Sequence, residues 1–361
     1  MKIIVLGTRG IPDIQGGVET HCEELYPRLS DLGHDITLIT RTPYVKNKKI
    51  LKFKGVQLKH IYSPKHKVFE AIVHTFLGIL YAAFKRPDYI HIHTVGPMLL
   101  TPLAKLLGLR IIVTNHGADY NRKKWGKIAR NIIKLGEKLG SKYADKIIVI
   151  SKIIKDHLKE KYNRNDASLI YNGVSIPVKT LKTDYIGLLG LEKQKYIIAV
   201  GRFVEEKGFL DLVDAYSQIN TDIKLVLVGD ADHESNYSRS LKEKALDNGV
   251  FLTGFIKGEE LKQIFTFTKL FILPSYHEGL PISLLEAMSY DLDILVSNIP
   301  ANLEIDLEKD DYFKVGNLSD LTKSLERKLS SYNKRDFSLI INKKYNWESI
   351  AKHTSIVYYR D

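Results

Sequence analysis

The chain has 361 residues, 44% of them hydrophobic and 27% charged, which excludes wholesale disorder and predicts two domains, because a single hydrophobic core rarely serves a chain of this length. A single cysteine, Cys22, excludes an internal disulfide. Residues 1–180 hold 31 Lys and Arg against 14 Asp and Glu, a net charge of +17 within a total of +12, so the first half is expected to meet an anionic partner: nucleic acid, acidic lipid or a charged substrate.

The apolar stretches are too short or too interrupted for a confident membrane span. The longest, residues 68–84, contains Glu70 and His74. The first run, Lys2–Gly7, passes at once into a glycine-containing loop, as a buried strand does, so no signal peptide is expected. We therefore expect a cytoplasmic protein, either soluble or held at the inner face of the plasma membrane.

Apolar runs alternate with amphipathic segments through the first half of the chain. Helices are expected at residues 18–32 and 68–85. Strands separated by helices are typical of βαβ units and of a parallel sheet. The expected strands are Lys2–Gly7, Asp35–Thr40, Tyr89–His93, Arg110–Thr114 and Lys146–Ser151.

The pattern breaks near Gly173, and a second alternating series begins at Tyr196. We therefore place the domain boundary between residues 178 and 179. The predicted fold is α/β, with two Rossmann-like, doubly wound parallel-sheet domains that face a cleft at the carboxyl ends of both sheets. The second set of strands is expected at Tyr196–Gly201, Lys224–Gly229, Phe251–Thr253, Leu270–Leu273 and Ile294–Ser297.

The loop after the first strand carries Gly16 and Gly17 just before a helix. The glycine spacing is not G-x-G-x-x-G, and residues 40–42 (Thr-Arg-Thr) stand where a dinucleotide ribose would require an acidic residue, so nicotinamide binding is disfavoured. The glycine pair still places backbone amides at a helix start that points into the expected cleft.

Histidines stand near the ends of two expected strands. His91 and His93 share a strand face, but no third metal ligand lies nearby in sequence, so we expect no metal site there. His116 and Asp119 follow the next strand, where side chains face the cleft and reach a ligand hydroxyl or a second substrate. The alternative for His116 is a structural histidine with its hydrogen bonds satisfied inside the protein.

The loop 201–208 (GRFVEEKG) directly follows a strand. Arg202 offers a planar fork of donors and Lys207 a mobile point charge, and both suit a diphosphate. The loop lacks the P-loop spacing. The alternative is an ordinary basic surface loop.

Two glutamates, Glu278 and Glu286, flank a helix start that we expect near Pro281. Gly279 lets the backbone approach a ligand closely, and the amides of this helix start form an anion site. The two carboxylates are spaced to bind hydroxyls at separate points of one ligand while the amides take its phosphate. The alternative is a solvated pair, because glutamates eight residues apart are common.

Taken in order, these motifs resemble glycosyltransferase family 4, whose members have the two-domain GT-B fold and retain anomeric configuration. The resemblance spans nearly the whole chain, and the opening GTRGIPDIQGGVET is similar to a bacterial, rhamnosyltransferase-like subgroup that acts in surface-polysaccharide assembly. It implies that a C-terminal helix at about 346–361 crosses back to domain 1–178, which binds the acceptor, and that domain 179–345 binds the donor.

The resemblance also implies roles for individual residues. Arg202 and Lys207 would neutralise the departing diphosphate. Glu286 would hold the ribose, and Glu278 the sugar hydroxyls. The residues implied in catalysis are His116, Glu278, Arg202 and Lys207. Those implied in donor binding are Gly16, Gly17, Arg202, Lys207, Phe255, Ile256, Glu278, Gly279, Leu280, Pro281, Ile282 and Glu286. Arg9 and Asp119 are assigned to the acceptor side.

The implied reaction is transfer of a sugar from a nucleotide diphosphate sugar, with UDP favoured, to a saccharide acceptor that we expect to be lipid-linked, in capsule or O-antigen synthesis. No cofactor and no divalent metal are expected, because fixed cations and helix dipoles meet the leaving-group charge. The short acidic patterns at 230–232 and 291–293 match a metal-nucleotide motif of another glycosyltransferase class, and we interpret them as chance matches.

A basic, amphipathic segment at residues 122–134 suggests a membrane contact. Trp125, Ile128, Ile132 and Leu135 would share one helical face flanked by Lys and Arg, and residues 65–86 form a second candidate. The alternative is a helix docked on the sheet with a solvated basic face.

Two other classes of function remain open. One is a different GT-B enzyme, such as a sugar-nucleotide epimerase or a phosphorylase-like protein. The other is a basic nucleic-acid-binding protein, which is disfavoured because the chain carries no recognised motif or stacking platform beside its charge. The oligomeric state is left open.

Overall fold

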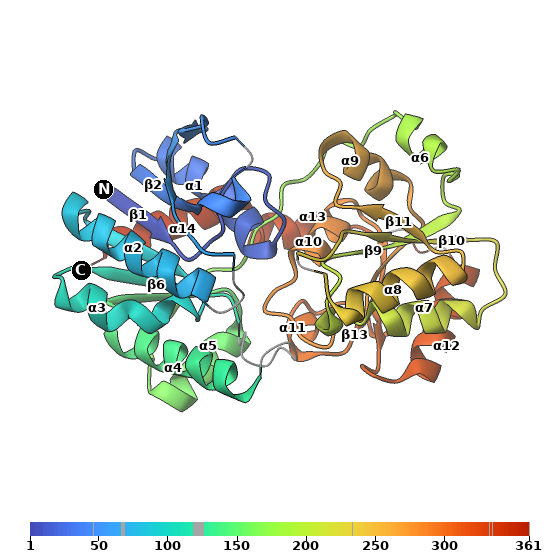
Figure 1. The fold of residues 1–361 in the computed structure, drawn as a ribbon. Coiled ribbons are helices and arrows are strands. Elements are labelled where there is room, and N and C mark those ends of the chain that lie inside the picture. Colours follow the sequence, from blue (N-terminus) through green and yellow to red (C-terminus); the bar gives the residue numbers. More distant parts are fainter. Residues whose placement is uncertain are drawn as a thin grey trace. The chain divides into compact units, whose positions relative to one another are not determined.

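The computed structural model describes residues 1–45, 47–65, 69–117, 126–232, 234–331, 333 and 335–360. The chain divides into two compact units: unit 1 comprises Met1–Gly173 with Asn346–Asp361, and unit 2 comprises Val174–Tyr345 (Figure 1). The boundary thus falls at Gly173, earlier than the predicted residue 178, because Gly173 packs against Trp347 of unit 1: a Cβ there would lie 2.5 Å from the indole ring.

Unit 1 is built on an eight-stranded sheet with the order β3-β4-β2-β1-β5-β6-β7-β8. Every neighbouring pair is parallel except β3 with β4. Without the short β3, the order starts 3-2-1-4-5-6, as in nucleotide-binding folds. The strands are β1 (Lys2–Leu6), β2 (Asp35–Arg41), β3 (Lys52–Phe53), β4 (Val56–Ile61), β5 (Tyr89–His93), β6 (Ile111–Asn115), β7 (Lys146–Val149) and β8 (Ser168–Leu169).

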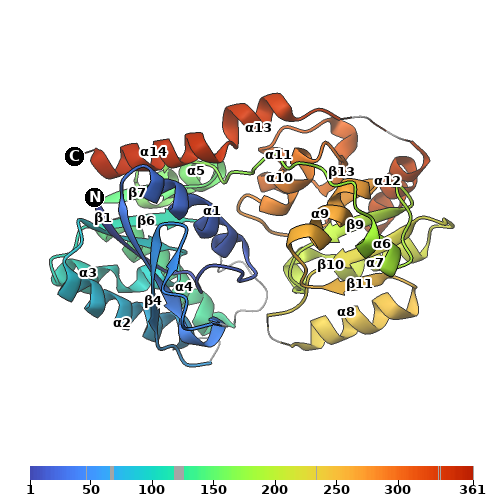
Figure 2. The ribbon, with the colours of Figure 1, turned by 90° about the horizontal axis from the view of Figure 1, so that it is seen from above.

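Helices cover both faces of this sheet, which explains why its central strands are almost continuously apolar. α1 and α14 pack together on one face, and α2, α3 and α4 lie on the other (Figures 1 and 2). The core between the sheet and the α1–α14 pair includes Tyr26, Trp347 and Tyr358. The helices are α1 (Gly17–Asp31), α2 (Phe69–Lys85), α3 (Thr101–Leu106), α4 (Lys127–Tyr143), α5 (Lys152–Tyr162) and α14 (Trp347–Tyr359), with 3-10 turns η1 (Thr42–Tyr44) and η2 (Pro97–Leu100).

The last helix, α14, belongs to unit 1 although unit 2 precedes it in the chain. Asn346 caps it by accepting hydrogen bonds from the amides of Glu348 (2.9 Å) and Ser349 (3.1 Å). Lys146 on β7 donates to the carbonyl of Val357 over 3.0 Å. The final segment is therefore part of the first unit's core.

Unit 2 has a six-stranded, fully parallel sheet with the order β11-β10-β9-β12-β13-β14. Counted within the unit, this is the order 3-2-1-4-5-6. The strands are β9 (Tyr196–Val200), β10 (Lys224–Val228), β11 (Phe251–Gly254), β12 (Leu270–Leu273), β13 (Asp293–Ser297) and β14 (Tyr312–Phe313). The helices are α6 (Asp184–Leu188), α7 (Phe209–Ser217), α8 (Asn236–Asp247), α9 (Gly258–Phe267), α10 (Ile282–Ser289), α11 (Pro300–Leu303), α12 (Leu318–Ser330) and α13 (Ser338–Lys344), with 3-10 turns η4 (Glu205–Lys207) and η5 (Lys309–Asp311).

Four charged side chains form a buried cluster beneath α12. Lys328 donates to Asp293 over 2.6 Å and to Asp311 over 2.8 Å, and Arg335 also pairs with Asp311. Lys328 is only 2% exposed, and Asp311 is completely buried. Arg335 also pairs with the exposed Glu308 over 2.9 Å, so the cluster ties α12 to β13 and η5.

No helix in the described part of the chain is both long enough and apolar enough to cross a bilayer.

Candidate functional site

Two loops that carry predicted donor-binding residues, 201–208 and 274–281, meet at the centre of the unit 2 sheet. β9 and β12 are hydrogen-bonded neighbours at the point where the strand order reverses. The loop 201–208 leaves the carboxyl end of β9, and the loop 274–281 leaves the carboxyl end of β12. Ligands of open α/β sheets bind outside the carboxyl ends of the strands at this reversal.

The structure brings Lys207 and Glu278 together. The Lys207 ammonium lies 2.6 Å from Glu278 Oε1, and Ser275 Oγ donates to the same oxygen over 2.6 Å. Both charged side chains are mostly buried, at 15% and 12% exposed. Burial alone would raise the pKa of Glu278, but the charge and hydrogen bond of Lys207 and the hydrogen bond of Ser275 outweigh it, so the pKa lies below its usual value. Glu278 is thus an anion beside a fixed cation.

Arg202 lies in the same loop as Lys207 and pairs with Asp232 over 2.8 Å. Asp230, the other acid of the first short acidic pattern, pairs with Lys242 over 2.7 Å. Each of these carboxylates is therefore engaged by a cation of its own, and Asp232 holds the guanidinium of Arg202 beside the carboxyl end of β9. This role of Asp232 was not predicted.

Backbone contacts hold the two loops against each other. The amide of Tyr276 donates to the carbonyl of Glu206 over 2.8 Å. The buried Phe203 anchors the first loop, because its backbone N–H donates a hydrogen bond to the carbonyl of Asp230 over 3.1 Å. Gly208 has a φ of +67°. A Cβ on it would lie 2.2 Å from the carbonyl oxygen of Pro274, so only glycine allows this approach. Lys207 is thereby positioned over the end of β12.

The helix that carries Glu286 begins one residue later than predicted. α10 starts at Ile282, and Pro281 occupies the position before it, with extended backbone. Glu286 lies inside this helix, half-buried, about one turn from its start. Gly279 and Leu280 lie in the connection between the Glu278 carboxylate and this helix start.

Phe255 and Ile256 follow the carboxyl end of β11, the edge strand. Phe255 is exposed, whereas the side chain of Ile256 is buried. They lie on the same edge of the sheet as the loops after β9 and β12, two strands away from β9.

In unit 1, the glycine-bearing loop is organised by a residue that the sequence did not single out, Glu19. Its buried carboxylate accepts from the amide of Arg9 (3.0 Å) and from Thr8 Oγ1 (3.3 Å). Gly16 has a φ of +146°, and a Cβ on it would lie 2.1 Å from Glu19 Oε2. Gly17, the first residue of α1, has open space above its Cα. Arg9 is thus held inside this loop, where its guanidinium also donates to a carbonyl over 3.0 Å.

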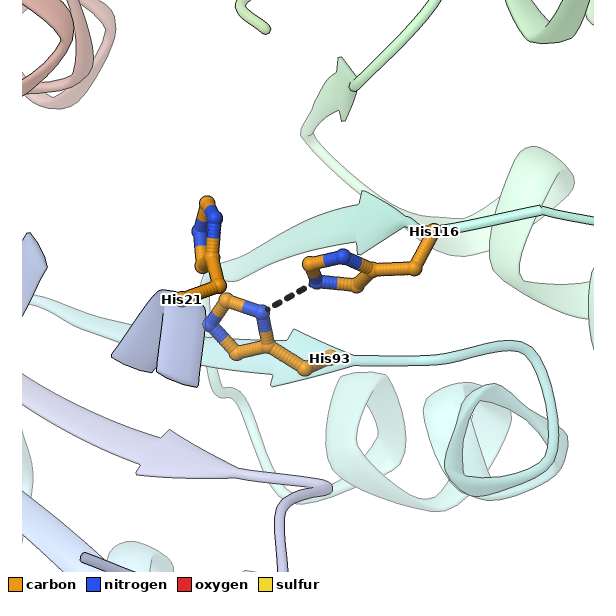
Figure 3. A group of neighbouring side chains, drawn as sticks. All are labelled: His21, His93 and His116. Carbon is orange, nitrogen blue, oxygen red and sulfur yellow. Dashed lines mark hydrogen bonds between the residues drawn. The ribbon is translucent and has the colours of Figure 1, made fainter. Parts of the chain in front are cut away.

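Three histidines from distant parts of unit 1 converge at the carboxyl edge of its sheet (Figure 3). His93 ends β5, His116 directly follows β6, and their Nδ1 and Nε2 atoms lie 2.9 Å apart. His21, on α1, packs edge-on against His116 with the ring centres 4.9 Å apart, and its Nδ1 lies 2.9 Å from Asn172 Oδ1. No motif in the sequence predicted His21 as part of this group. Asp119 lies outside the described residues.

His91 stacks on His93 and extends this group into the core. Its Nδ1 contacts the hydroxyls of Tyr26 (3.0 Å) and Tyr358 (2.8 Å), and its Nε2 contacts Thr114 Oγ1 (2.7 Å). The two histidines that share a strand face therefore have different surroundings, since His91 is enclosed by hydroxyls and His93 faces His116.

Burial makes these imidazoles poor bases. It lowers the pKa of His116 to about 3, with the neighbouring His91 adding to the effect. Burial likewise lowers the pKa of His93 and of His21 well below the usual value, and the adjacent histidines lower both further. All three rings are therefore neutral at physiological pH.

Comparison with known proteins gives a consistent result in both units. A family described as Glycosyltransferase Family 4 matches residues 15–176, and one described as Glycosyl transferases group 1 matches residues 186–344. The uncharacterized glycosyltransferase MJ1607 of Methanocaldococcus jannaschii is 25% identical over 99% of this chain and 98% of its own length. The putative teichuronic acid biosynthesis glycosyltransferase TuaC of Bacillus subtilis is 24% identical over 83% of this chain and 81% of its own.

Solved structures share the fold. Sucrose-phosphate synthase from Thermosynechococcus elongatus superimposes with a TM-score of 0.82 at 20% identity, covering 99% of this chain and 98% of that one. Anabaena HepE, solved in complex with UDP-glucose, superimposes with a TM-score of 0.79 at 18% identity and the same coverage. The predicted GT-B fold is confirmed.

Proposed function

The chain belongs to glycosyltransferase family 4, and we propose that it transfers a sugar, with retention of configuration, from a nucleotide diphosphate sugar to a saccharide acceptor. The observation that carries this proposal is the Lys207–Glu278 pair at the reversal point of the unit 2 sheet, with Arg202 in the same loop. HepE, which has the same fold, was solved with UDP-glucose, so UDP is the first donor nucleotide to test.

In the proposed donor site, the basic side chains bind the diphosphate and the carboxylates bind hydroxyl groups. Lys207 has three N–H donors, so it can keep its bond to Glu278 while it binds a phosphate oxygen. Arg202 adds a planar fork for the same diphosphate. Glu278, held as an anion, accepts from the sugar hydroxyls, and Glu286 accepts from the ribose. Phe255 and Ile256 are proposed to lie beside the base.

In the proposed reaction, the bond between the anomeric carbon and the diphosphate oxygen breaks as the acceptor hydroxyl attacks from the same face. The hydroxyl proton passes to the departing phosphate oxygen, and the positive charge that develops on the sugar ring is transient. Lys207, Arg202 and the backbone N–H groups of Gly279, Leu280 and Ile282 stabilise the leaving charge, which is electrostatic catalysis by groups already in place. The proposal therefore requires no divalent metal for transfer. His116, a neutral ring, contacts the sugar near the reacting carbon, and Arg9 serves the acceptor side.

The donor assignment is tested by a ligand screen on the whole chain. At a concentration 100 times its dissociation constant, a nucleotide diphosphate that binds should add about 2.7 kcal/mol to the free energy of unfolding. This stabilisation is measured as a raised melting temperature. UDP, GDP and dTDP are compared with double-stranded DNA, and the matching UDP-, GDP- and dTDP-sugars are assayed for slow hydrolysis without acceptor, with and without EDTA.

Stabilisation by one nucleotide, with EDTA-resistant hydrolysis of its sugar, is the expected result. Stabilisation by DNA alone would instead favour the nucleic-acid-binding alternative. Interconversion of a donor sugar without release of the nucleotide would favour an epimerase.

We also propose that unit 1 binds an anionic membrane surface and thereby reaches a lipid-linked acceptor of surface-polysaccharide synthesis. The similar protein TuaC is named a putative teichuronic acid biosynthesis glycosyltransferase. α2 and α4 lie on one face of the unit 1 sheet. Phe84 on α2 and Ile128 on α4 are 81% and 79% exposed, and Lys85 and Lys127 are next to them in sequence. Exposed apolar and basic side chains together suit an interfacial contact. Trp125, part of the predicted face, lies outside the described residues.

Liposome flotation tests this contact. The chain should float with vesicles that contain phosphatidylglycerol and should be released by high salt, because each basic residue near such a surface contributes about 1 kcal/mol. The double variant Phe84→Asp, Ile128→Asp should lose most of this binding. Leu188→Asp, which changes an exposed leucine of unit 2, serves as the matched control and should float like the wild type. Equal recovery with neutral and anionic vesicles would contradict the proposal.

A further inference from the structure

The three-histidine cluster has the composition of a metal site. One nitrogen each of His21, His93 and His116 lies within 4.8 Å of the corresponding nitrogens of the other two (Figure 3). Among the residues that the structure describes, this is the one group of three His, Cys, Asp or Glu side chains that converges in this way. Imidazole nitrogens suit zinc, copper and nickel, whereas magnesium and calcium prefer oxygen ligands.

In two of the rings, a hydrogen bond to the nitrogen that faces away from the cluster orients the other nitrogen as a metal site requires. Asn172 Oδ1 can only accept, so the proton of His21 lies on Nδ1 and Nε2 carries the lone pair. His93 contacts the Tyr26 hydroxyl through Nε2 over 2.5 Å, which leaves Nδ1 directed toward His116. Metal-binding histidines characteristically donate their other N–H to such a partner, which fixes the tautomer and the ring orientation.

The adjustment needed between His93 and His116 is small. Two zinc–nitrogen bonds of about 2.0–2.1 Å at a tetrahedral angle place their nitrogens about 3.3 Å apart. His93 Nδ1 and His116 Nε2 are now 2.9 Å apart, so this pair would open by a few tenths of an ångström. The pair is joined by a single shared proton, which moves to the outer nitrogen of one ring when the metal enters.

We propose that His21, His93 and His116 bind one divalent transition-metal ion of the zinc class, with a fourth coordination position left open. This site goes beyond the donor chemistry proposed above, which needs no metal. One consequence does rest on the proposed function: an ion there engages His116 and should therefore inhibit sugar transfer.

Cobalt(II) is the probe, because it substitutes for zinc in such sites and its visible absorption depends on the geometry of its ligands. The chelator-treated whole chain should develop a strong tetrahedral absorption band that saturates at one equivalent of Co²⁺, and Zn²⁺ should abolish the band. His21→Ala should lose it. His353→Ala, which removes an exposed histidine of α14, is the matched control and should retain it.

A second variant covers the case in which His21→Ala does not fold, as checked by far-UV circular dichroism. Tyr26→Phe removes only the hydroxyl that orients His93, and it should weaken Co²⁺ binding about 10–100-fold. A Co²⁺ titration with the wild-type affinity in both variants, or no band in the wild type, would overturn the site and leave the cluster as a hydrogen-bonded network only. Since absorption does not depend on transfer, failure of this proposal is distinguishable from failure of the proposed enzyme activity.

Discussion

Lys207→Ala is expected to lower kcat/KM for sugar transfer by about 10²–10³-fold, the usual cost of removing one preorganised charge-stabilising donor. The lysine is mostly buried beside Glu278, so its charge acts in a region of weak screening. Its loss removes the cation proposed to meet the departing diphosphate, and it also leaves Glu278 without its ion-pair partner. The fall should therefore affect kcat more than KM. Initial rates with the donor identified in the ligand screen measure it.

Two further variants make this result specific. Lys207→Arg keeps the charge with a different geometry and should recover part of the rate. Lys224→Ala removes an exposed lysine at the amino end of β10, whereas the proposed site lies at the carboxyl ends of the strands of the same sheet. This variant should behave as the wild type. A Lys207→Ala enzyme with full turnover would remove the central support for the donor site.

Lys328→Met is expected to reduce the free energy of unfolding by about 3–5 kcal/mol, because it leaves two buried carboxylates with one cation. Asp293 and Asp311 both accept from Lys328, and neither can be rehydrated while the fold is intact. Methionine has nearly the same length, so lost packing contributes little. Urea denaturation followed by far-UV circular dichroism gives the change.

The control for this variant lies on the same helix. Lys323 on α12 is exposed, and Lys323→Met should change the free energy of unfolding by less than about 0.5 kcal/mol. If both variants unfolded at the same urea concentration as the wild type, the buried cluster would contribute nothing to stability.

Much of the fold could be predicted from the sequence because central parallel strands are apolar on both faces. β5 has the predicted limits, Tyr89–His93, and β9 differs from the prediction at its last residue. The two-residue strands β3, β8 and β14 were not predicted, since two residues give no periodicity, and the six-residue β4 was also missed. The position of Pro281 was predicted one residue too far inside its helix, which is the usual uncertainty at helix ends.

The two halves of the candidate site differ in how far the sequence could predict them. Lys207 and Glu278 are 71 residues apart, yet each follows a strand end, so the rule for parallel sheets places them on one edge. His21 lies inside a helix and bonds Asn172, 151 residues away. No periodic pattern links such positions. Only the packing of α1 against the sheet brings His21 to the end of β5.

The placement of α14 in the first unit has a consequence for how the protein is made. Synthesis proceeds from the amino terminus, so Trp347 and Tyr358, which complete the core of unit 1, leave the ribosome after the whole of unit 2. Unit 2 is one uninterrupted stretch, Val174–Tyr345, so it has all its residues available earlier. The second unit can therefore finish folding first on the ribosome, while the first waits with part of its apolar interior uncovered. Tyr358, the hydrogen-bond partner of His91, is synthesised after unit 2 is complete.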